Sequence, residues 1–311
     1  MNNRKSLLSY PFEGRVHPQA MELENQVNKW LDGYHFLPET FRQNERKISI
    51  GHLVASAWPE APYERLIPVA RWFLAGFLHD DHNTKLPLKD LVRVTERIYE
   101  VCNGAAITSE DDEIIRHFSI SVDEFRQFAT PDWMERYLRH AYLFFDGVLS
   151  ESFYNFKNIY PSLEEYIDIR EKTMGVLALA DLTEVASCNI LPYEIYLHPT
   201  IQRMGKLSGF LLAWANDIYS MKREKSENET MNLVLVIWRN RGCSLEAALE
   251  AAIQLHDDYV AEFLRLRSKL PDFHEFNADV ERYVSSLELM ISGHLIWIPQ
   301  ATRYHVQLED N

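Results

Sequence analysis

The chain has 311 residues, of which 46% are hydrophobic and 25% are charged, a balance that excludes an intrinsically disordered protein and allows a large buried core. Its formal net charge of −14 argues against a nucleic-acid-binding surface, because phosphate backbones are held by clustered Lys and Arg. Three cysteines, Cys102, Cys188 and Cys243, are too few for a disulfide scaffold and lack the close spacing of a zinc site.

The N-terminal segment, MNNRKSLLSYPFEGRVHP, lacks the long apolar core of a secretory signal peptide. No segment of the sequence reaches the ~18 uninterrupted apolar residues that a membrane-spanning helix needs. We therefore expect a cytoplasmic protein with no membrane span.

Helical periodicity dominates the sequence. Apolar residues recur at three- and four-residue spacings, and the chain contains only 11 glycines. The pattern predicts helices over residues 18–33, 38–56, 66–82, 88–103, 110–128, 131–149, 162–188, 199–225, 230–241, 245–269 and 275–298. Prolines disfavour helix at the preceding residue, so breaks are expected at Pro59, Pro62, Pro87, Pro131, Pro161, Pro192, Pro199 and Pro271. Pro68 is instead expected in the first turn of its helix, where a missing N–H costs little.

No repeat, low-complexity tract or Gly/Ser linker marks a domain boundary, so we predict one all-α domain over residues 1–311. The most apolar segments lie around 66–82, 162–188 and 199–225, and we expect them to face the interior of a helical bundle. Polar groups inside such a bundle are costly unless partners or metal ions match them. The polar residues beside these segments are therefore candidates for a functional site.

Two adjacent carboxylates, Asp80 and Asp81, end the first of these segments, in RWFLAGFLHDDHNTK. Acidic side chains near a helix C-terminus face its negative pole, which costs about 0.3–1 kcal/mol for each group. The placement indicates a positively charged partner. Two further Asp-Asp pairs have ordinary explanations: residues 111–112 precede an apolar segment as a helix start does, and residues 257–258 lie on the polar face of an amphipathic helix.

Arg170, in YIDIREKTMGVLALADL, precedes an apolar helical run that Gly175 interrupts. A guanidinium at this place could form bidentate hydrogen bonds to phosphate oxygens. The alternative is a surface ion pair with Glu164, Asp168 or Glu171. The residue by itself does not decide between the two.

Asn216, Ser220 and Glu224, in NDIYSMKREKSENE, are spaced i, i+4, i+8, so they lie within about 80° of one another on one helix face. Amide, hydroxyl and carboxylate oxygens are hard ligands that suit Mg²⁺, which commonly shares its coordination with substrate phosphates. Arg223 lies near the same stripe. A merely wet polar face is the alternative, but the apolar approach LSGFLLAWA mirrors the WFLAGFL that leads to Asp80, which favours a site.

Arg303 and Tyr304 follow HLIWIPQAT near the C-terminus and say little alone. Taken in order, however, these motifs resemble the class I terpene synthase family of bacteria and fungi. The resemblance runs from AWPEAPYERLIPVARWFLAGFLHDD through LEEYIDIREKTMG and NDIYSMKRE to HLIWIPQATRY. It implies a single-domain helical bundle around a central apolar cavity, and a lyase that ionises and cyclises a linear isoprenoid diphosphate with release of diphosphate.

The most specific element of the resemblance is the NDxxSxxxE pattern, which begins at Asn216 and includes Asp217. It implies three Mg²⁺ ions, held by Asp80, Asp81, Asn216, Ser220 and Glu224. It assigns diphosphate binding to Arg170, Arg223, Arg303 and Tyr304. The residues expected to carry the reaction are Asp80, Arg170, Asn216, Ser220 and Glu224.

Phe77 and Trp297 match the aromatic residues that line the family's cavity, where their π faces could stabilise a carbocation. The alternative is that both rings fill the core. The sequence departs from the family in HDDHNTK, where no further carboxylate follows the Asp pair, so the principal metal ligand of this motif is expected to be Asp80. No effector residue is assigned among Thr173, Met174 and Gly175.

Substrate length is open between farnesyl diphosphate (C15), which the chain length favours, and geranylgeranyl diphosphate (C20). A prenyl chain-elongating synthase is disfavoured, because it would show a second aspartate-rich motif in place of Asn216 and its partners. A metal phosphohydrolase using His79 and Asp80 lacks further suitable ligands. A non-catalytic helical binding protein is the alternative from another class, and a homodimer is left open.

Overall fold

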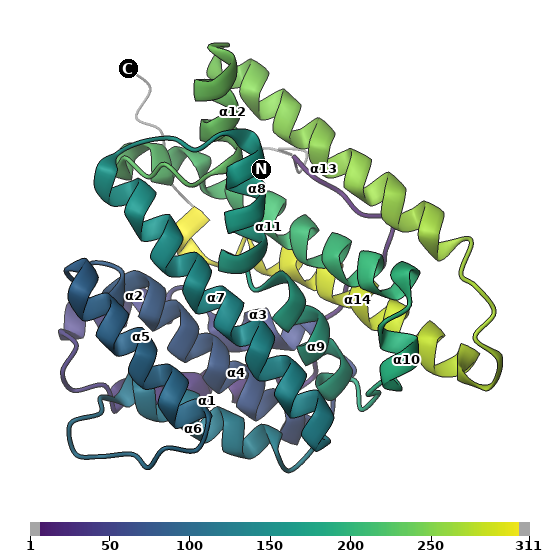
Figure 1. Cartoon of the computed structure of the whole chain (residues 1–311), viewed down its shortest axis with the longest axis horizontal. Helices are drawn as coiled ribbons and strands as arrows, with labels where there is room; N and C mark the ends of the chain where they lie inside the picture. The colour runs from purple at the N-terminus through teal and green to yellow at the C-terminus, as the bar shows by residue number, and fades with distance from the viewer. Residues whose placement is uncertain (1–6, 305–311) are drawn as a thin grey trace.

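The computed structural model describes residues 7–304. Over that range the chain folds entirely into helices and connecting loops, without a β-strand, which confirms the expected all-α class (Figure 1). The α-helices are α1 (Ala20–Asp32), α2 (Glu39–Arg46), α3 (Ile50–Ala57), α4 (Tyr63–Leu78), α5 (Leu88–Cys102), α6 (Glu113–Phe125), α7 (Pro131–Lys157), α8 (Leu163–Thr173), α9 (Val176–Ala186), α10 (Tyr193–Tyr196), α11 (Pro199–Glu227), α12 (Leu233–Arg241), α13 (Leu245–Arg267) and α14 (Asn277–Trp297). Three short turns complete them: the π-helix η1 (His79–Asn83) and the 3-10 turns η2 (His274–Phe276) and η3 (Thr302–Tyr304).

Two of the expected helices are each two helices in the structure. The segment expected over 38–56 divides into α2 and α3, because Ser49 adopts a left-handed conformation (φ 59°) that ends one hydrogen-bond ladder before the next begins. The segment expected over 162–188 divides into α8 and α9 at Gly175, whose φ of 63° suits a residue without a Cβ.

Smaller differences concern the helix ends. Pro68 lies inside α4, which already begins at Tyr63, so its expected place in the first turn is wrong. Helix α7 continues to Lys157 rather than ending near residue 149, and the short helix α10 was not expected. The helix start expected at residues 111–112 is confirmed, since the Asp112 carboxylate accepts a hydrogen bond from Ile115 N at 3.0 Å.

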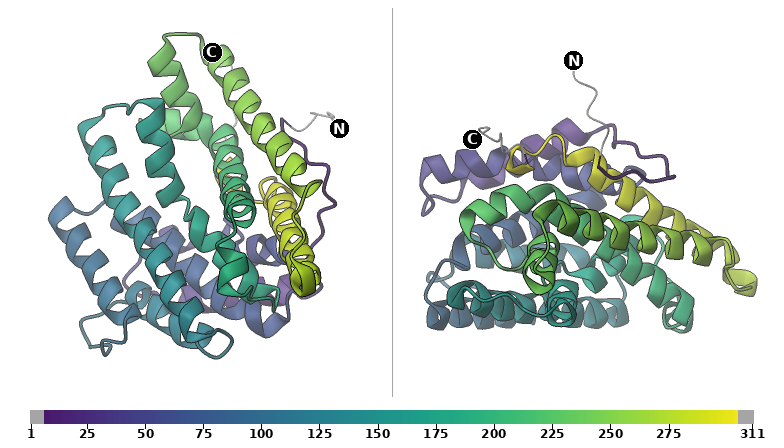
Figure 2. Two further views of the ribbon diagram at one scale, coloured as in Figure 1. Left: turned by 45° about the vertical axis from the view of Figure 1, so that its right-hand side comes forward. Right: turned by 90° about the horizontal axis from the view of Figure 1, so that it is seen from above.

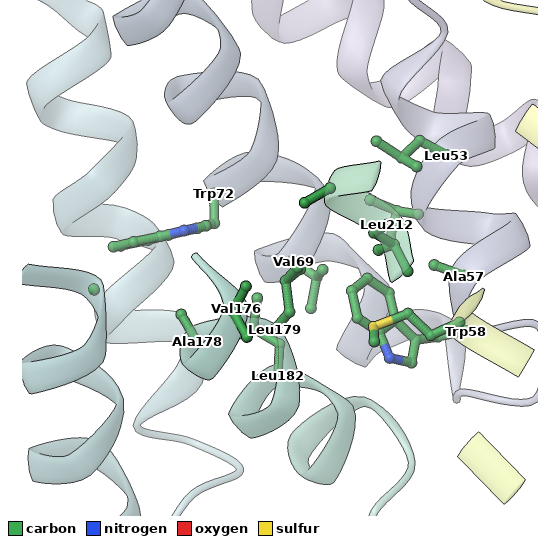
Figure 3. Packing of buried hydrophobic residues seen from close by; sticks show 14 of the residues in the cluster. Leu53, Ala57, Trp58, Val69, Trp72, Val176, Ala178, Leu179, Leu182 and Leu212 are labelled. Carbon is green, nitrogen blue, oxygen red and sulfur yellow. The ribbon is translucent and has the colours of Figure 1, made fainter. Parts of the chain in front are cut away.

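Helix α11 lies at the centre of the bundle and packs against α8, α9, α12, α13 and α14 (Figure 1). Its residues from Leu207 to Ala215 are all buried, which explains why this segment is apolar on every side. Figure 2 shows α13 running beside α11. Figure 3 shows how Val69 of α4, Leu179 of α9 and Leu212 of α11 contribute to one hydrophobic core.

Close helix packing places the C-terminal segment. Helix α14 approaches α3 so closely that a Cβ on Gly293 would lie 1.8 Å from the carbonyl oxygen of Ser56. The chain then turns through η3, which returns to α11. The end of α4, the end of α8, the C-terminal half of α11 and η3 therefore converge on one region. Among the described helices, none is long and apolar enough to cross a membrane.

Candidate active site

Arg170 lies near the end of α8 and reaches α11. Its Nη2 donates hydrogen bonds to Asn216 Oδ1 at 3.0 Å and to Asp217 Oδ1 at 2.6 Å. Two of its three alternative partners pair with other residues: Asp168 with Lys172 at 3.0 Å, and Glu171 with Lys206 at 2.6 Å. The guanidinium is thus directed into the bundle rather than along its surface.

Asp217 belongs to the NDxxSxxxE motif, which assigns it no role, and the structure shows which groups it contacts. It is fully buried at the edge of the stripe formed by Asn216, Ser220 and Glu224, about 20° around the helix from Glu224. Besides the Arg170 bond, its Oδ2 accepts hydrogen bonds from the Tyr166 hydroxyl and from Leu233 N, the latter at 2.7 Å. Burial raises the pKa of Asp217 to about 6, and the Arg170 charge opposes that rise. Asp217 therefore clamps Arg170 against α11.

The C-terminal pair joins both ends of this region. Asn216 Nδ2 donates to the Tyr304 hydroxyl at 2.6 Å. Arg303 Nη2 lies 3.9 Å from Asp81 Oδ1, and the guanidinium lies over the ring of Phe77, 5.2 Å from its centroid. The turn η3 therefore spans the gap between α11 and the aspartate-bearing end of α4.

Ser220 is fully buried one turn beyond Asn216, and its Oγ has no hydrogen-bond partner within residues 7–304. An unsatisfied buried hydroxyl costs about 1–3 kcal/mol, so proteins seldom leave one without a ligand. The orphaned oxygen lies on the stripe expected to hold a metal ion. A buried hydroxyl oxygen without a hydrogen-bond partner fits coordination to a hard cation.

Glu224 is held from two sides. Arg223 Nη2 donates to Glu224 Oε1 at 2.9 Å, and Asn232 Nδ2 donates to Glu224 Oε2 at 2.8 Å. Asn232 also caps α12, where its Oδ1 accepts a bond from Val234 N at 2.9 Å. Sequence reasoning missed Asn232: an Asn before LVLVI signals a helix start, but nothing in the sequence indicates its bond to Glu224.

The aspartate end of the site is a π-helical turn, a rare form that is frequent at functional sites. His79 points into the core, where Asn83 Nδ2 lies 3.0 Å from its Nδ1 and the Phe145 ring is 5.4 Å away. Burial lowers the pKa of His79 to about 4, so the ring is neutral near pH 7. A neutral His79 buried in the core, while Asp80 is exposed, weakens the phosphohydrolase alternative further.

The pKa of Asp80 depends on charged groups near the end of α4 and on α11. Its side chain is exposed on one side, but the protein removes water from the other side, and this desolvation raises the pKa of Asp80 to about 6. The Asp81 charge adds to the rise. Arg303 and Arg170 lower this pKa, and Glu224 raises it. Carboxylates at the ends of α4 and α11 thus interact electrostatically, as two sides of one site would.

Three further carboxylates surround these groups and carried no sequence signal, because they come from three separate elements. Burial is the first cause that raises the pKa of each, to about 8 for Glu45, about 8 for Glu151 and about 7 for Glu229. Among the described residues, no three His, Cys, Asp or Glu side chains form a ready metal cluster. A cation here would rely also on amide, hydroxyl, water or substrate oxygens, as Mg²⁺ commonly does.

Open space adjoins the aspartate end. Gly76 lies one turn before Asp80, and a Cβ on it would meet nothing within 4 Å. Phe77 is partly accessible and makes an edge contact with Trp297, with centroids 6.4 Å apart. Trp297 is buried and anchored by its Nε1 bond to Ile48 O at 2.7 Å. Lining of a cavity by the two rings stays a prediction.

Two surface hollows elsewhere, of about 350 and 180 Å³, are lined by residues of 270–281 and 140–206, respectively. None of the predicted metal-binding or diphosphate-binding residues lines either hollow. We therefore assign no function to these hollows.

Known proteins resemble this chain in sequence along nearly its whole length. Residues 71–262 match the family described as terpene synthase family 2, C-terminal metal binding. Over 302 residues the chain is 28% identical to germacrene A synthase of Nostoc punctiforme, covering 95% of this chain and 93% of the relative. It is also 28% identical over 305 residues to a (+)-T-muurolol synthase of Roseiflexus castenholzii, covering 96% and 94%. The metal-binding family model supports a divalent metal cofactor.

Solved structures agree on the fold. Germacradien-4-ol synthase from Streptomyces citricolor superposes with a TM-score of 0.82 at 21% identity, covering 98% of this chain and 100% of that one. Hedycaryol synthase in complex with HEPES gives 0.82 at 20% identity, with 94% and 98% covered. The family match and the full-length relatives exclude the non-catalytic alternative. The chain belongs to the class I terpene synthase family and is an enzyme of that type.

Proposed function

We propose that the chain is a Mg²⁺-dependent cyclase that ionises farnesyl diphosphate and releases diphosphate and a sesquiterpene. The observation that carries this proposal is the continuous set of contacts from Arg170 through Asn216 to Tyr304, with Arg303 beside Asp81. These contacts gather basic side chains and oxygen ligands between the ends of α4 and α11.

The named relatives support a C15 substrate. The Roseiflexus castenholzii relative is named as (2E,6E)-farnesyl diphosphate cyclizing, and both it and the Nostoc punctiforme relative match along nearly the whole chain. Geranylgeranyl diphosphate is the second candidate, since the space beside Gly76 sets no upper limit on chain length.

The proposed metal ligands fit Mg²⁺ in chemistry. They are Asp80, Asp81, Asn216, Ser220 and Glu224, all oxygen donors. The buried Ser220 oxygen, which has no hydrogen-bond partner in the described part of the chain, supports its role as a metal ligand. Bound Mg²⁺, three ions in our proposal, would supply positive charge to the oxygens of the departing diphosphate.

The remaining groups act on the two parts of the substrate. Arg170, Arg223, Arg303 and Tyr304 would donate hydrogen bonds to the diphosphate, and because they are fixed before it departs, their charge lowers the barrier. No general base is needed at the start, since departure of the leaving group triggers the reaction. Apolar walls would keep water from the allylic cation, with the Phe77 and Trp297 rings stabilising its charge.

The test is a product assay with purified protein. C10, C15 and C20 isoprenoid diphosphates are each incubated with Mg²⁺ or with a chelator, and the organic extract is examined by mass spectrometry. We expect a cyclic C15 hydrocarbon or alcohol, with equimolar diphosphate, only when both Mg²⁺ and the C15 substrate are present. Asn216→Ala should abolish this turnover. If products form only from the C20 substrate, the substrate is geranylgeranyl diphosphate rather than farnesyl diphosphate. Turnover without a metal ion would contradict the mechanism.

A further inference from the structure

We propose that Glu45 of α2 is a positioning residue of this site, which holds Arg303 beside Asp81. The inference rests on the proposed function. It assigns to the aspartate end a carboxylate from a helix earlier in the chain, which no motif indicates.

Helix α2 presents one face to the aspartate end. The Phe41 ring packs edge-on against His82 of η1, with centroids 6.0 Å apart. Glu45 follows Phe41 by four residues, so both side chains project from the same face of α2. The face that covers η1 therefore carries a carboxylate.

The residues after α2 bind the C-terminal segment. Thr302 N donates to Lys47 O at 3.1 Å, and Trp297 Nε1 donates to Ile48 O at 2.7 Å. Glu45 is thus fixed next to the segment that carries Arg303, as well as next to the turn that carries Asp81.

Glu45 is 6% exposed, and its Oε2 is buried without a hydrogen-bond partner in the described part of the chain. The charged groups that act on it are Asp81, Arg303, Asp80 and Lys85. A buried carboxylate oxygen without a donor is costly. Arg303 can donate a hydrogen bond to Glu45, because its distance of 3.9 Å from Asp81 is too long for a hydrogen bond between those two residues.

These observations define what Glu45 does. If Asp81 bound a cation, Arg303 would lose the one acidic neighbour that lies within ion-pair distance among residues 7–304, and Glu45 would keep the guanidinium in place for the diphosphate. The ordinary stability of α2 has other sources, since Glu39 on its exposed side pairs with Arg42 at 2.6 Å. Substitution at Glu45 should therefore affect ligand binding more than folding.

The experiment measures the thermal unfolding temperature of the full chain while Mg²⁺ is titrated at fixed pyrophosphate. It is carried out above pH 8, where the Glu45 carboxyl, whose pKa is raised by burial to about 8, is ionised. Glu45→Gln, which keeps the side-chain volume, is compared with the wild type and with the matched control Glu39→Gln on the exposed face of α2. We expect Glu45→Gln to need about three to ten times more Mg²⁺ for half of the stabilisation, with Glu39→Gln at the wild-type value. Glu45→Asp keeps the charge but has a shorter side chain, so its Mg²⁺ requirement should lie between those of the wild type and Glu45→Gln.

An unchanged Mg²⁺ requirement in folded Glu45→Gln overturns the inference. If that variant does not fold, an unchanged requirement in Glu45→Asp overturns it equally. Failure of the proposed function would give a different result, because the wild type itself would then gain no stability from Mg²⁺ and pyrophosphate. That result would also contradict the role of Glu45.

Discussion

Two buried polar residues of α11, Asp217 and Ser220, differ in their hydrogen bonding. Asp217 receives hydrogen bonds from Arg170, Tyr166 and Leu233 N, so its buried carboxylate is fully used within the protein. Ser220, three residues later, has a buried hydroxyl with no partner in residues 7–304. Because a satisfied group stabilises the fold and an unsatisfied one destabilises it, the first is a clamp and the second is a candidate ligand.

Ser220→Ala should separate folding from metal binding. Since the hydroxyl makes no hydrogen bond to any described residue, its removal should leave the unfolding temperature of the metal-free protein unchanged or slightly higher. The Mg²⁺ concentration for half-maximal activity should rise about tenfold or more. Both are measured on the same purified protein, by thermal unfolding and by product formation.

Ser208→Ala is the matched control for that change. Ser208 is buried in the same helix, but its Oγ donates to Gly205 O at 2.8 Å. Its loss should cost about 0.5–1.5 kcal/mol of stability without altering the Mg²⁺ requirement. Equal Mg²⁺ requirements in Ser220→Ala and Ser208→Ala would show that Ser220 is not a metal ligand.

At the scale of elements, the helix ends and breaks direct the functional side chains. Arg170 lies close to the end of α8, whose separation from α9 depends on the left-handed Gly175. Helix α4 changes to a π-helical turn at His79, and this turn carries Asp80 and Asp81. Side chains near such ends can leave the helix-packing surface and meet a ligand, which the middle of a packed helix does not allow.

Gly76 of α4 is a helix glycine next to open space. Gly76→Ala should stabilise the fold by about 0.5–1 kcal/mol in urea unfolding, because alanine is the better helix former and its Cβ meets nothing within 4 Å. Gly76→Leu should fill the space and change the product mixture seen by mass spectrometry, with helix content retained. Identical products and turnover for glycine and leucine would show that the substrate does not reach this position.

Ligand closure should be visible at two element ends. We predict that Mg²⁺ and pyrophosphate together order the segments after residues 82 and 225, and so slow tryptic cleavage at the exposed Lys85 and Lys225. Lys269, exposed between α13 and α14, is the internal control and should be cut at an unchanged rate. Unchanged cleavage at all three sites would contradict closure.

At the scale of the whole molecule, the site collects carboxylates from across the fold. The Glu45, Glu151 and Glu229 carboxyls have pKa values raised by burial to about 8, 8 and 7, against ordinary values of 4.5. The folded protein therefore binds more protons than the unfolded chain above pH 4.5, and loses stability as the pH rises toward 8. Buried histidines act in the opposite sense but only below their ordinary pKa of 6.5, since burial lowers the values to about 4 for His79 and about 3 for His117 and His294.

The pH window that isolates the carboxylates is therefore about 6.5 to 8. The unfolding temperature of the metal-free protein should fall across it, and Glu151→Gln should make the fall shallower, because glutamine cannot lose the proton. Thermal unfolding at several pH values checks both. A stability that rises from pH 6.5 to 8 would contradict the raised pKa values.

Much of this molecule follows from local sequence. The helices follow from apolar periodicity, which acts over three and four residues, and the all-α class is confirmed. The common face of Asn216, Ser220 and Glu224 follows from the 100° step of one helix. What local reasoning missed inside these elements was backbone reversal at Ser49, since nothing in the side chain of serine demands a positive φ.

Only the tertiary structure decided which distant groups meet. Arg303 reaches Asp81, Asn232 supports Glu224, and Glu45 lies beside the aspartate end because helices far apart in sequence pack together. Hydrophobic packing is not directional, so periodicity predicts which face of a helix is buried and says little about which helix covers it. Local periodicity is enough to predict the helices and the stripe of oxygen-bearing side chains on α11, whereas the charges and hydrogen bonds around that stripe depend on how the helices pack.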